Sequence, residues 1–490
     1  MKKNGKKQQK QNPGNQKQKK QKNRELAVIT YLFIGLFTLL IGYFIYFETV
    51  LSPDVINNPY NSRQDSFAER VIRGKILAAD GEVLAQTEVA EDGTETRSYP
   101  YGNAFSHVVG YSTRGKTGIE SLSNFSLLTS NAFFGERINN EIKEKKNVGD
   151  NVVTTLDATL QQIAYDALGN HRGAVVVLEA ETGKVLSMVS KPDFNPNRIN
   201  QDWEKLTAGE ESESVLYNRA TQGLYAPGST FKIVTLLEYM RENADYESFH
   251  FNCSSSLTEG NYTISCYGKK AHGEEDLQKA FAKSCNTAFA SVGLSLDEVI
   301  FKDTCQSLLF NSELPIDLPY SKSSFSLKAD ATPAERMMTA IGQGETVVSP
   351  LHMALLVSSI ANQGVLMKPY LIDRVESYTG DVVKSYRPSV SGTLMTEAEA
   401  AVLTEYMEAV VTEGTGSKLN DLGFPVAGKT GTAEYTKDKS KSHAWFAGFS
   451  NTGESDIVVC VLVEEAGSGS EYAVPIARQI FAAWRNKKET

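Results

Sequence analysis

Residues 225–235 read YAPGSTFKIVT and place the hydroxyl of Ser229 three residues before the amine of Lys232. Pro227 and Gly228 interrupt regular structure, so the pattern predicts a turn that leads into the apolar helix IVTLLEYM. Ser229 can be an ordinary helix N-cap and Lys232 a solvated charge. An S-x-x-K pattern arises by chance about once or twice in a chain of this length, so taken alone the capping interpretation is favoured. Other segments must decide between capping and chemistry.

Two short patterns downstream supply further candidates. Ser284-Cys285-Asn286 lies in LQKAFAKSCNTAFASVG, and Lys429-Thr430-Gly431-Thr432 lies in GFPVAGKTGTAEY. We expect the second on an edge strand that a ligand can approach closely, because Gly431 has no side chain. Another KTG, Lys116-Thr117-Gly118, stands in YSTRGKTGIE before Ser229, without apolar alternation, and we assign it to a surface turn.

The order S-x-x-K, S-x-N, K-T-G is a signature of penicillin-binding proteins and serine β-lactamases. Because it carries these three motifs in this order, the chain resembles a class B, monofunctional penicillin-binding protein. Since it has little beyond the transpeptidase domain, it resembles the penicillin-binding protein A type. The stretches ERVIRGKILAADGEVLA, NRATQGLYAPGSTFK and AIGQGETVVSPLHMA are similar to the accessory-domain opening, the active-site approach and the Gly-Gln-Gly region of such proteins. The resemblance covers the chain from about residue 58 to its end.

The residue types of the first motif suit nucleophilic catalysis. Residues i and i+3 of a helix share a face, so we expect Lys232 to hydrogen-bond the hydroxyl of Ser229. Serine becomes a nucleophile when a base takes its proton. Lysine has a reference pKa of about 10.4 and must be held neutral to be that base. Burial, the helix N-terminus and a second cation at Lys429 all lower this pKa. We expect Ser229 to attack an acyl carbonyl and Lys232 to accept its proton.

The resemblance implies roles for the other motif residues. Ser284 relays a proton toward the leaving amine, and Asn286 hydrogen-bonds the amide backbone of the substrate. Lys429 supports this network, while the hydroxyls of Thr430 and Thr432 receive the substrate carboxylate. Without the resemblance, each of these residues has an ordinary alternative role in capping, packing or a surface turn.

The implied activity is that of a D,D-transpeptidase that cross-links peptidoglycan. A stem peptide ending in D-Ala-D-Ala forms an acyl-enzyme on Ser229. The backbone N–H groups of Ser229 and Thr432 form the oxyanion hole. β-Lactams acylate the same serine. The alternatives are a D,D-carboxypeptidase, a β-lactam sensor and a non-catalytic scaffold of the wall-synthesis complex. A class A β-lactamase would need a deacylating glutamate between Ser284 and Lys429, where Glu345 is one acid available.

The N-terminal sequence predicts a membrane anchor. Residues 1–24 carry ten Lys/Arg and no acid, and we expect a disordered basic tail. Residues 26–47 form an uncharged run of 22 residues, longer than the apolar region of a secretory signal. We therefore predict an uncleaved single-pass helix over 25–47, with the tail in the cytoplasm and the catalytic part outside the cell membrane. Topology suffices to explain the basic tail, so we expect no nucleic acid partner.

The pattern of predicted strands and helices divides the rest of the chain into two parts. Residues 48–150 contain short strands and loops and predict a small accessory, or pedestal, domain. Residues 151–490 predict an α+β domain of the penicillin-binding and serine β-lactamase type. Its antiparallel sheet has helices on both sides, and both ends of the domain contribute strands to it. Gly173–Ser190 reads as a hairpin, and Asp157 as an N-cap. With no second catalytic domain in view, we expect a polytopic glycan polymerase as membrane partner.

The cysteines and histidines suggest no metal or cofactor. The spacing of the five cysteines fits no zinc site, and the six histidines show no metal-ligand spacing. Cys253 and Cys266 bracket a turn-rich segment, so we hold a disulfide between them as a hypothesis. Cys460, in the apolar run IVVCVLV, reads as a core residue.

Overall fold

The structure is a computed structural model that describes residues 13–47, 70–208, 215–434 and 441–489. By contacts it divides into two compact units, residues 1–61 and residues 62–490, and each is described by itself below.

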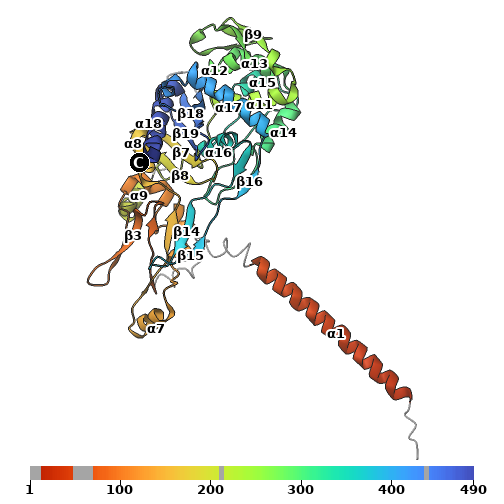
Figure 1. Cartoon of the computed structure of the whole chain (residues 1–490), viewed down its shortest axis with the longest axis vertical. Helices are drawn as coiled ribbons and strands as arrows, with labels where there is room; N and C mark the ends of the chain where they lie inside the picture. Colours follow the sequence, from red (N-terminus) through yellow and green to blue (C-terminus); the bar gives the residue numbers. More distant parts are fainter. Residues whose placement is uncertain (1–12, 48–69, 209–214, 435–440, 490) are drawn as a thin grey trace, which may run out of the picture. The chain divides into compact units, whose positions relative to one another are not determined.

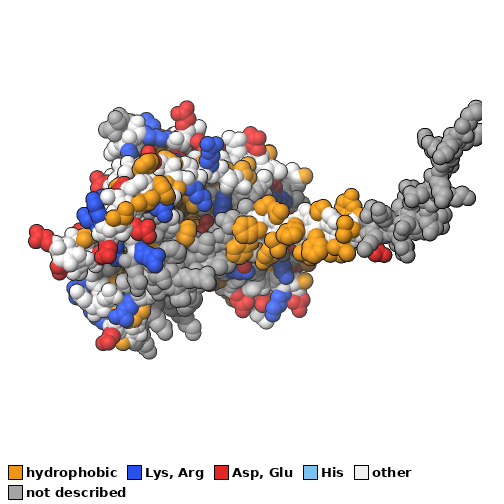
Figure 2. All heavy atoms as spheres, turned by 90° about the horizontal axis from the view of Figure 1, so that it is seen from below, with side chains coloured by type: hydrophobic (Ala, Val, Ile, Leu, Met, Phe, Trp, Pro, Cys, Tyr) orange, Lys and Arg blue, Asp and Glu red, His pale blue; other side chains and the backbone are white. Residues whose placement is uncertain are grey.

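Helix α1 (Pro13–Tyr46) lies in the first unit. Its stretch Arg24–Tyr46 has a mean hydropathy of 2.3 and none of it is buried, so apolar side chains form a continuous surface (Figure 2). Such a helix is consistent with a single membrane anchor or a signal sequence. Disorder was predicted for residues 1–24, but from Pro13 onward this stretch is helical, because lysine and glutamine are good helix formers. Residues 1–12 lie outside the described residues.

A five-stranded antiparallel sheet forms the centre of the second unit (Figure 1). Its strands follow the order β17 (Val426–Ala433), β18 (His443–Ser450), β19 (Ile457–Val463), β7 (Gly173–Glu179) and β8 (Val185–Lys191). Strand β19 pairs with β7 along its whole length, from Ile457 opposite Glu179 to Val463 opposite Gly173. Strands from the end of the chain therefore rejoin the predicted hairpin, which confirms the expected α+β sheet.

Helices cover both faces of this sheet (Figure 1). On one face, α8 (Ala158–Leu168) and α18 (Gly469–Glu489) share a core with Val175 and every second residue along β7. On the other face, α16 (Pro350–Ala361) packs against the residues in between, such as Val176. Both faces are apolar because both are buried. The side chain of Asp157 accepts a hydrogen bond from the N–H of Leu160 and begins α8, as predicted.

The chain between β8 and β17 forms a mainly helical lobe. Its helices include η4 (Gly228–Phe231), α11 (Lys232–Glu242), α12 (Leu277–Ala282), α13 (Asn286–Ser295), α14 (Glu298–Ser307), α15 (Pro333–Ala340) and α17 (Glu397–Thr412). Short antiparallel pairs join β9 (His250–Cys253) to β12 (Gly273–Asp276), β10 (Ser256–Glu259) to β11 (Tyr262–Ser265) and β13 (Val365–Met367) to β16 (Val390–Thr393).

A second sheet crosses the predicted domain boundary at residue 150. Its order is β15 (Val382–Ser385), β14 (Ile372–Glu376), β6 (Asn151–Thr154), β2 (Ile76–Leu77), β3 (Val83–Val89) and β4 (Glu95–Ser98). Strands β2 and β3 pair antiparallel. Strand β6, expected to open the second domain, pairs with β2, and the distant strand β14 pairs with β6. The accessory part thus takes strands from three regions of the sequence. Its short helices include α5 (Gly118–Leu122) and α7 (Phe134–Ile142), and α9 (Ile199–Thr207) follows β8.

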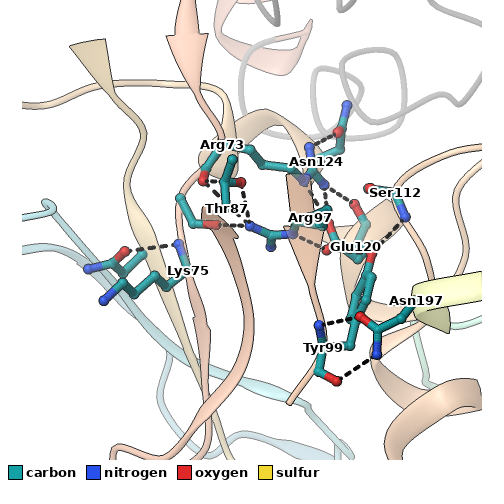
Figure 3. A network of polar contacts seen from close by, with 11 residues as sticks. Arg73, Lys75, Thr87, Arg97, Tyr99, Ser112, Glu120, Asn124 and Asn197 are labelled. Atoms are coloured by element: carbon teal, nitrogen blue, oxygen red, sulfur yellow. Dashed lines mark hydrogen bonds and ion pairs between the residues drawn. The ribbon is translucent and has the colours of Figure 1, made fainter. Parts of the chain in front are cut away.

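A buried ion-pair network holds the accessory part together (Figure 3). The carboxylate of Glu120 is fully buried and accepts hydrogen bonds from Arg73 at 2.6 Å and Arg97 at 2.7 Å. Burial opposes ionisation of Glu120, but the two guanidinium groups outweigh it and hold its pKa below the ordinary value. Tyr99 also donates to Glu120, and its backbone N–H and C=O bond the side chain of Asn197 at 2.8 and 2.9 Å. The network therefore links the accessory part to the chain that follows β8.

Candidate active site

Ser229 and Lys232 lie where the short helix η4 runs into α11. Gly228 has a φ of +53°, and its N–H donates to the C=O of Gly342 at 2.8 Å. A Cβ at Gly228 would meet the carbonyl oxygen of Thr432 at 2.7 Å, so glycine allows η4 to pack directly on β17. Ser229 is half-buried at this junction, and Lys232 is fully buried.

Residues 284–286, which we call the S-x-N segment, join α12 to α13. Ser284 has a φ of +56°, in the left-handed region that favours glycine. The N–H of Cys285 donates to the C=O of Ala280 at 2.8 Å, so Ser284 ends α12 in the way that a C-terminal glycine usually does. The sulfur of Cys285 accepts a hydrogen bond from the N–H of Ala288 and caps α13. Two helix ends therefore fix the position of this segment.

The amines of Lys232 and Lys429 meet at the hydroxyl oxygen of Ser284. The Nζ atom of Lys232 lies 3.3 Å from this oxygen, and that of Lys429 lies 2.9 Å from it. Lys232 also donates to the C=O of Ser284 and to Oδ1 of Asn286, both at 2.8 Å. Three motifs that are far apart in the sequence thus share one hydrogen-bond network, as predicted.

Burial makes both lysines easier to deprotonate. It lowers the pKa of Lys232 to about 8. Burial also lowers the pKa of Lys429, and the charge of Lys232 lowers it further. A neutral amine keeps two N–H donors, and the two acceptors at 2.8 Å can take both from Lys232. Its lone pair then remains available to accept a proton.

A cavity of about 1080 Å³ lies in front of this network. Its lining includes Ser229, Ser284, Asn286, Thr430 and Thr432, which places hydroxyl groups from all three motifs on one surface. The side chains of Thr430 and Thr432 share a face because side chains alternate along β17. Gln343, from the stretch that resembles the Gly-Gln-Gly region, lines the same cavity.

Two details differ from the sequence-based expectation. The hydrogen bonds of Lys232 within the described residues go to the S-x-N segment, and the expected bond to the hydroxyl of Ser229 is not among them. Gly431 does not line the cavity. A Cβ at Gly431 would lie 2.9 Å from the carbonyl oxygen of Pro227 and from Cβ of Trp445, so glycine serves the packing of η4 on β17 and not the approach of a ligand.

The disulfide hypothesis is wrong for this structure. All five cysteines are free, and the sulfurs of Cys253 and Cys266 are 3.7 Å apart, beyond the bond length of about 2.05 Å. A cluster that the sequence patterns did not indicate is also present: the ligand atoms of Cys253, Cys266, His272 and Cys285 lie within 4.8 Å of one another. Sequence spacing hid it because a folded hairpin region brings the four residues together.

Other sequence candidates lie away from the network. Glu345 is exposed, hydrogen-bonds Ser326 and does not line the cavity, so it is not placed to act as a deacylating base. The early KTG copy leads into α5, where Thr117 is the N-cap residue, and not into a strand. Cys460 is fully buried in β19, as predicted.

The fold and the site together define an active-site-serine acyltransferase, with a serine, two buried lysines and an S-x-N segment beside an antiparallel sheet. Residues 173–482 match the penicillin binding protein transpeptidase domain, and residues 73–152 match the penicillin binding protein A dimerisation domain. The chain belongs to the class B penicillin-binding proteins of the PbpA-like kind, which are peptidoglycan D,D-transpeptidases.

Curated relatives and solved structures agree. The chain is 33% identical over 443 residues to the peptidoglycan D,D-transpeptidase PbpA of Mycolicibacterium smegmatis, with 84% of this chain and 88% of the relative covered. The D,D-transpeptidase domain from Eggerthella lenta superposes with a TM-score of 0.77 at 32% identity, covering 86% of this chain and 100% of that chain. The penicillin G acyl-enzyme of penicillin-binding protein A from M. tuberculosis gives a TM-score of 0.75 at 29% identity, covering 84% and 99%.

Proposed function

We propose that Ser229 is the nucleophile of this transpeptidase and Lys232 is the base that activates it. The Oγ atom of Ser229 attacks the carbonyl of the penultimate D-Ala, and its proton passes to the neutral amine of Lys232. The peptide bond to the terminal D-Ala breaks, and Ser284 relays a proton to the leaving amine. An amine of a neighbouring stem peptide then attacks the ester and restores the Ser229 hydroxyl.

One observation carries this assignment: Ser284 Oγ accepts from both buried lysines while it lines the same cavity as Ser229. In this proposal a proton moves between the two serines and a lysine at the wall of the cavity. Lys429 supports the relay by donating a hydrogen bond to Ser284.

The remaining motif residues bind substrate in this proposal. The hydroxyls of Thr430 and Thr432 face the cavity and receive the terminal carboxylate, and Asn286 binds the amide backbone of the stem peptide. The N–H groups of Ser229 and Thr432 hold the oxyanion, where one such donor contributes about 3–4 kcal/mol in other enzymes. Gly431 acts indirectly, by letting β17 lie close to η4.

The test is acylation by a fluorescent penicillin, followed on the full-length protein in detergent. Ser229→Ala should lose the label, while Ser470→Ala, a matched change in another cavity-lining serine, should keep it. Equal labelling of the wild type and Ser229→Ala would contradict the assignment. A Ser229→Ala protein that fully complements a depletion strain would favour a scaffold role over catalysis.

We also propose that α1 is an uncleaved anchor with a cytoplasmic N-terminus, so that the cavity faces the cell wall. The basic residues before the apolar stretch support this orientation. A polytopic glycan polymerase is the expected membrane partner, because no polymerising activity resides in the transpeptidase site. Protease added to intact protoplasts should remove the catalytic part and leave a membrane-embedded N-terminal fragment. Full protection of the catalytic part would reverse the topology.

A further inference from the structure

The geometry points to a metal site next to the active site: we propose that Cys253, Cys266, His272 and Cys285 bind one structural zinc ion. The four residues come from the end of β9, the segment after β11, the segment before β12 and the N-cap of α13. Their ligand atoms all lie within 4.8 Å of one another.

The distances between the ligand atoms fit a tetrahedral ion. Zinc binds sulfur at about 2.3 Å and nitrogen at about 2.0–2.1 Å, which separates two sulfurs by about 3.8 Å and a sulfur from a nitrogen by about 3.5 Å at tetrahedral angles. The sulfur of Cys266 lies 3.7 Å from that of Cys253 and 3.7 Å from that of Cys285. Nδ1 of His272 lies 3.5 Å from the sulfur of Cys253. Each of these separations agrees with a shared central ion.

The donor set selects the metal. Three thiolates and one imidazole form a closed tetrahedral set, which is typical of structural zinc and leaves no open position for catalysis. The three cysteine residues are at most 2% exposed, and the His272 side chain is 14% exposed, so solvent has little access to the ion.

The cluster has polar groups next to it, although cysteines that only fill an apolar core need no such neighbours. The hydroxyl of Thr287 lies 3.2 Å from the sulfur of Cys253 and 3.3 Å from that of Cys285, where it can donate to a thiolate. Among the described residues the buried carboxylate of Glu275 has no hydrogen-bond partner, and it lies 3.8 Å from Nδ1 of His272. A dication in the cluster places a positive charge beside this carboxylate.

The site would position part of the active site. Cys285 stands between Ser284 and Asn286, which both bond Lys232. The ion joins this segment to the hairpin region of β9–β12, and strand β11 of that region lines the active-site cavity. Cys285 is thus a positioning residue, and this consequence rests on the proposed function, while the metal site itself does not.

The primary test is metal content of the full-length protein purified in detergent without chelator. Elemental mass spectrometry of the wild type should find one zinc ion per chain. Cys266→Ala and His272→Ala should lose it. Cys460→Ala and His250→Ala, matched changes outside the cluster, should retain it. Metal-free wild-type protein, a Cys253–Cys266 disulfide, or zinc retained by both ligand variants would overturn the proposal.

Three further measurements cover a failure of the variants to fold and separate this proposal from the catalytic one. Cobalt(II) exchanged into the wild type should give the visible absorption of tetrahedral thiolate coordination, and absence of these bands would overturn the site. Ser229→Ala should still contain one zinc although it is not labelled by penicillin. Chelation should slow labelling of the wild type, and added zinc should restore it, whereas labelling unaffected by complete zinc removal would refute the positioning role.

Discussion

The amines of Lys232 and Lys429 approach a single acceptor, the hydroxyl oxygen of Ser284, at 3.3 and 2.9 Å. Two buried ammonium groups at one oxygen would repel each other, so the pair keeps both charges only at a cost. Burial and the charge of Lys232 both lower the pKa of Lys429, so Lys429 loses its proton more easily than an isolated lysine. Burial is the cause that lowers the pKa of Lys232, to about 8. In the proposed mechanism, this lowered pKa is what lets Lys232, an ordinarily charged residue, act as a base.

The acylation rate should rise with pH. Below the pKa of Lys232, about 8, its amine is protonated and cannot accept the proton of Ser229; above it, the amine is free and the rate levels off. The measurement is the second-order rate constant for a fluorescent penicillin from about pH 6 to about pH 10, corrected for spontaneous hydrolysis of the drug. A profile that is flat or falls with pH would contradict a lysine base.

Removing the amine should cost more than removing a nearby charge. Lys232→Met should slow acylation by about 10²–10⁴-fold, the usual contribution of a general base. Lys270→Met, a matched change in another lysine at the cavity, should have little effect because that side chain does not contact Ser284. Rate constants for both variants should be compared at one pH, and a similar loss in the two would point to a general electrostatic effect.

Ser284 offers a way to separate backbone strain from chemistry. Its left-handed conformation costs an L-residue about 1–2 kcal/mol that glycine avoids. Ser284→Gly should therefore be more stable than Ser284→Ala by about this amount in chemical denaturation, although both lack the hydroxyl. Both should acylate slowly, because the lysines lose their shared acceptor. Rapid acylation by either variant would remove Ser284 from the proton path.

Much of the site could be predicted because each motif carries its chemistry in consecutive residues. The junction that carries Ser229 and Lys232, the S-x-N segment and the strand of Lys429 all follow from short patterns whose order along the chain is specific. Their convergence was correct because the sheet that closes the fold joins the two ends of the domain. What the patterns did not give is the direction of each hydrogen bond, since side-chain packing decides whether Lys232 turns toward Ser229 or Ser284.

The failures share one physical cause, which is contact between residues distant in sequence. Strand β14 joins the sheet of the accessory part from more than two hundred residues away, a pairing that no local sequence pattern indicates. The Cys253 cluster is likewise assembled by two hairpins and a helix end, none of which has a metal-binding repeat in its own sequence. Gly431 was correctly placed on an edge strand, but its neighbour is Pro227 and not a ligand.

Gly431→Ala should disturb the site without removing a reactive group. The added methyl meets backbone and side-chain atoms at 2.9–3.0 Å, so strand β17 must move away from η4. We expect a loss of about 1–3 kcal/mol in stability, typical of overpacking, and slower acylation as Thr430 and Thr432 shift relative to Ser229. The matched control is Gly392→Ala on β16, where a Cβ meets nothing within 4 Å. Equal effects of the two substitutions on denaturation and labelling would argue against this packing role.

Glu120 should stabilise the accessory part through its buried pairs with Arg73 and Arg97. Glu120→Ala leaves two guanidinium groups without their partner, so we expect a loss of about 3–5 kcal/mol, measured by urea denaturation. Because the pKa of Glu120 is depressed in the folded state, its contribution is complete above the ordinary value and is lost as the pH falls through the folded value. The wild type should therefore lose this stability in acid, whereas the variant should not.

Glu91→Ala, which removes an exposed carboxylate of the same part, serves as control and should retain wild-type stability. A Glu120 variant as stable as that control at neutral pH would show that the network contributes nothing to the fold.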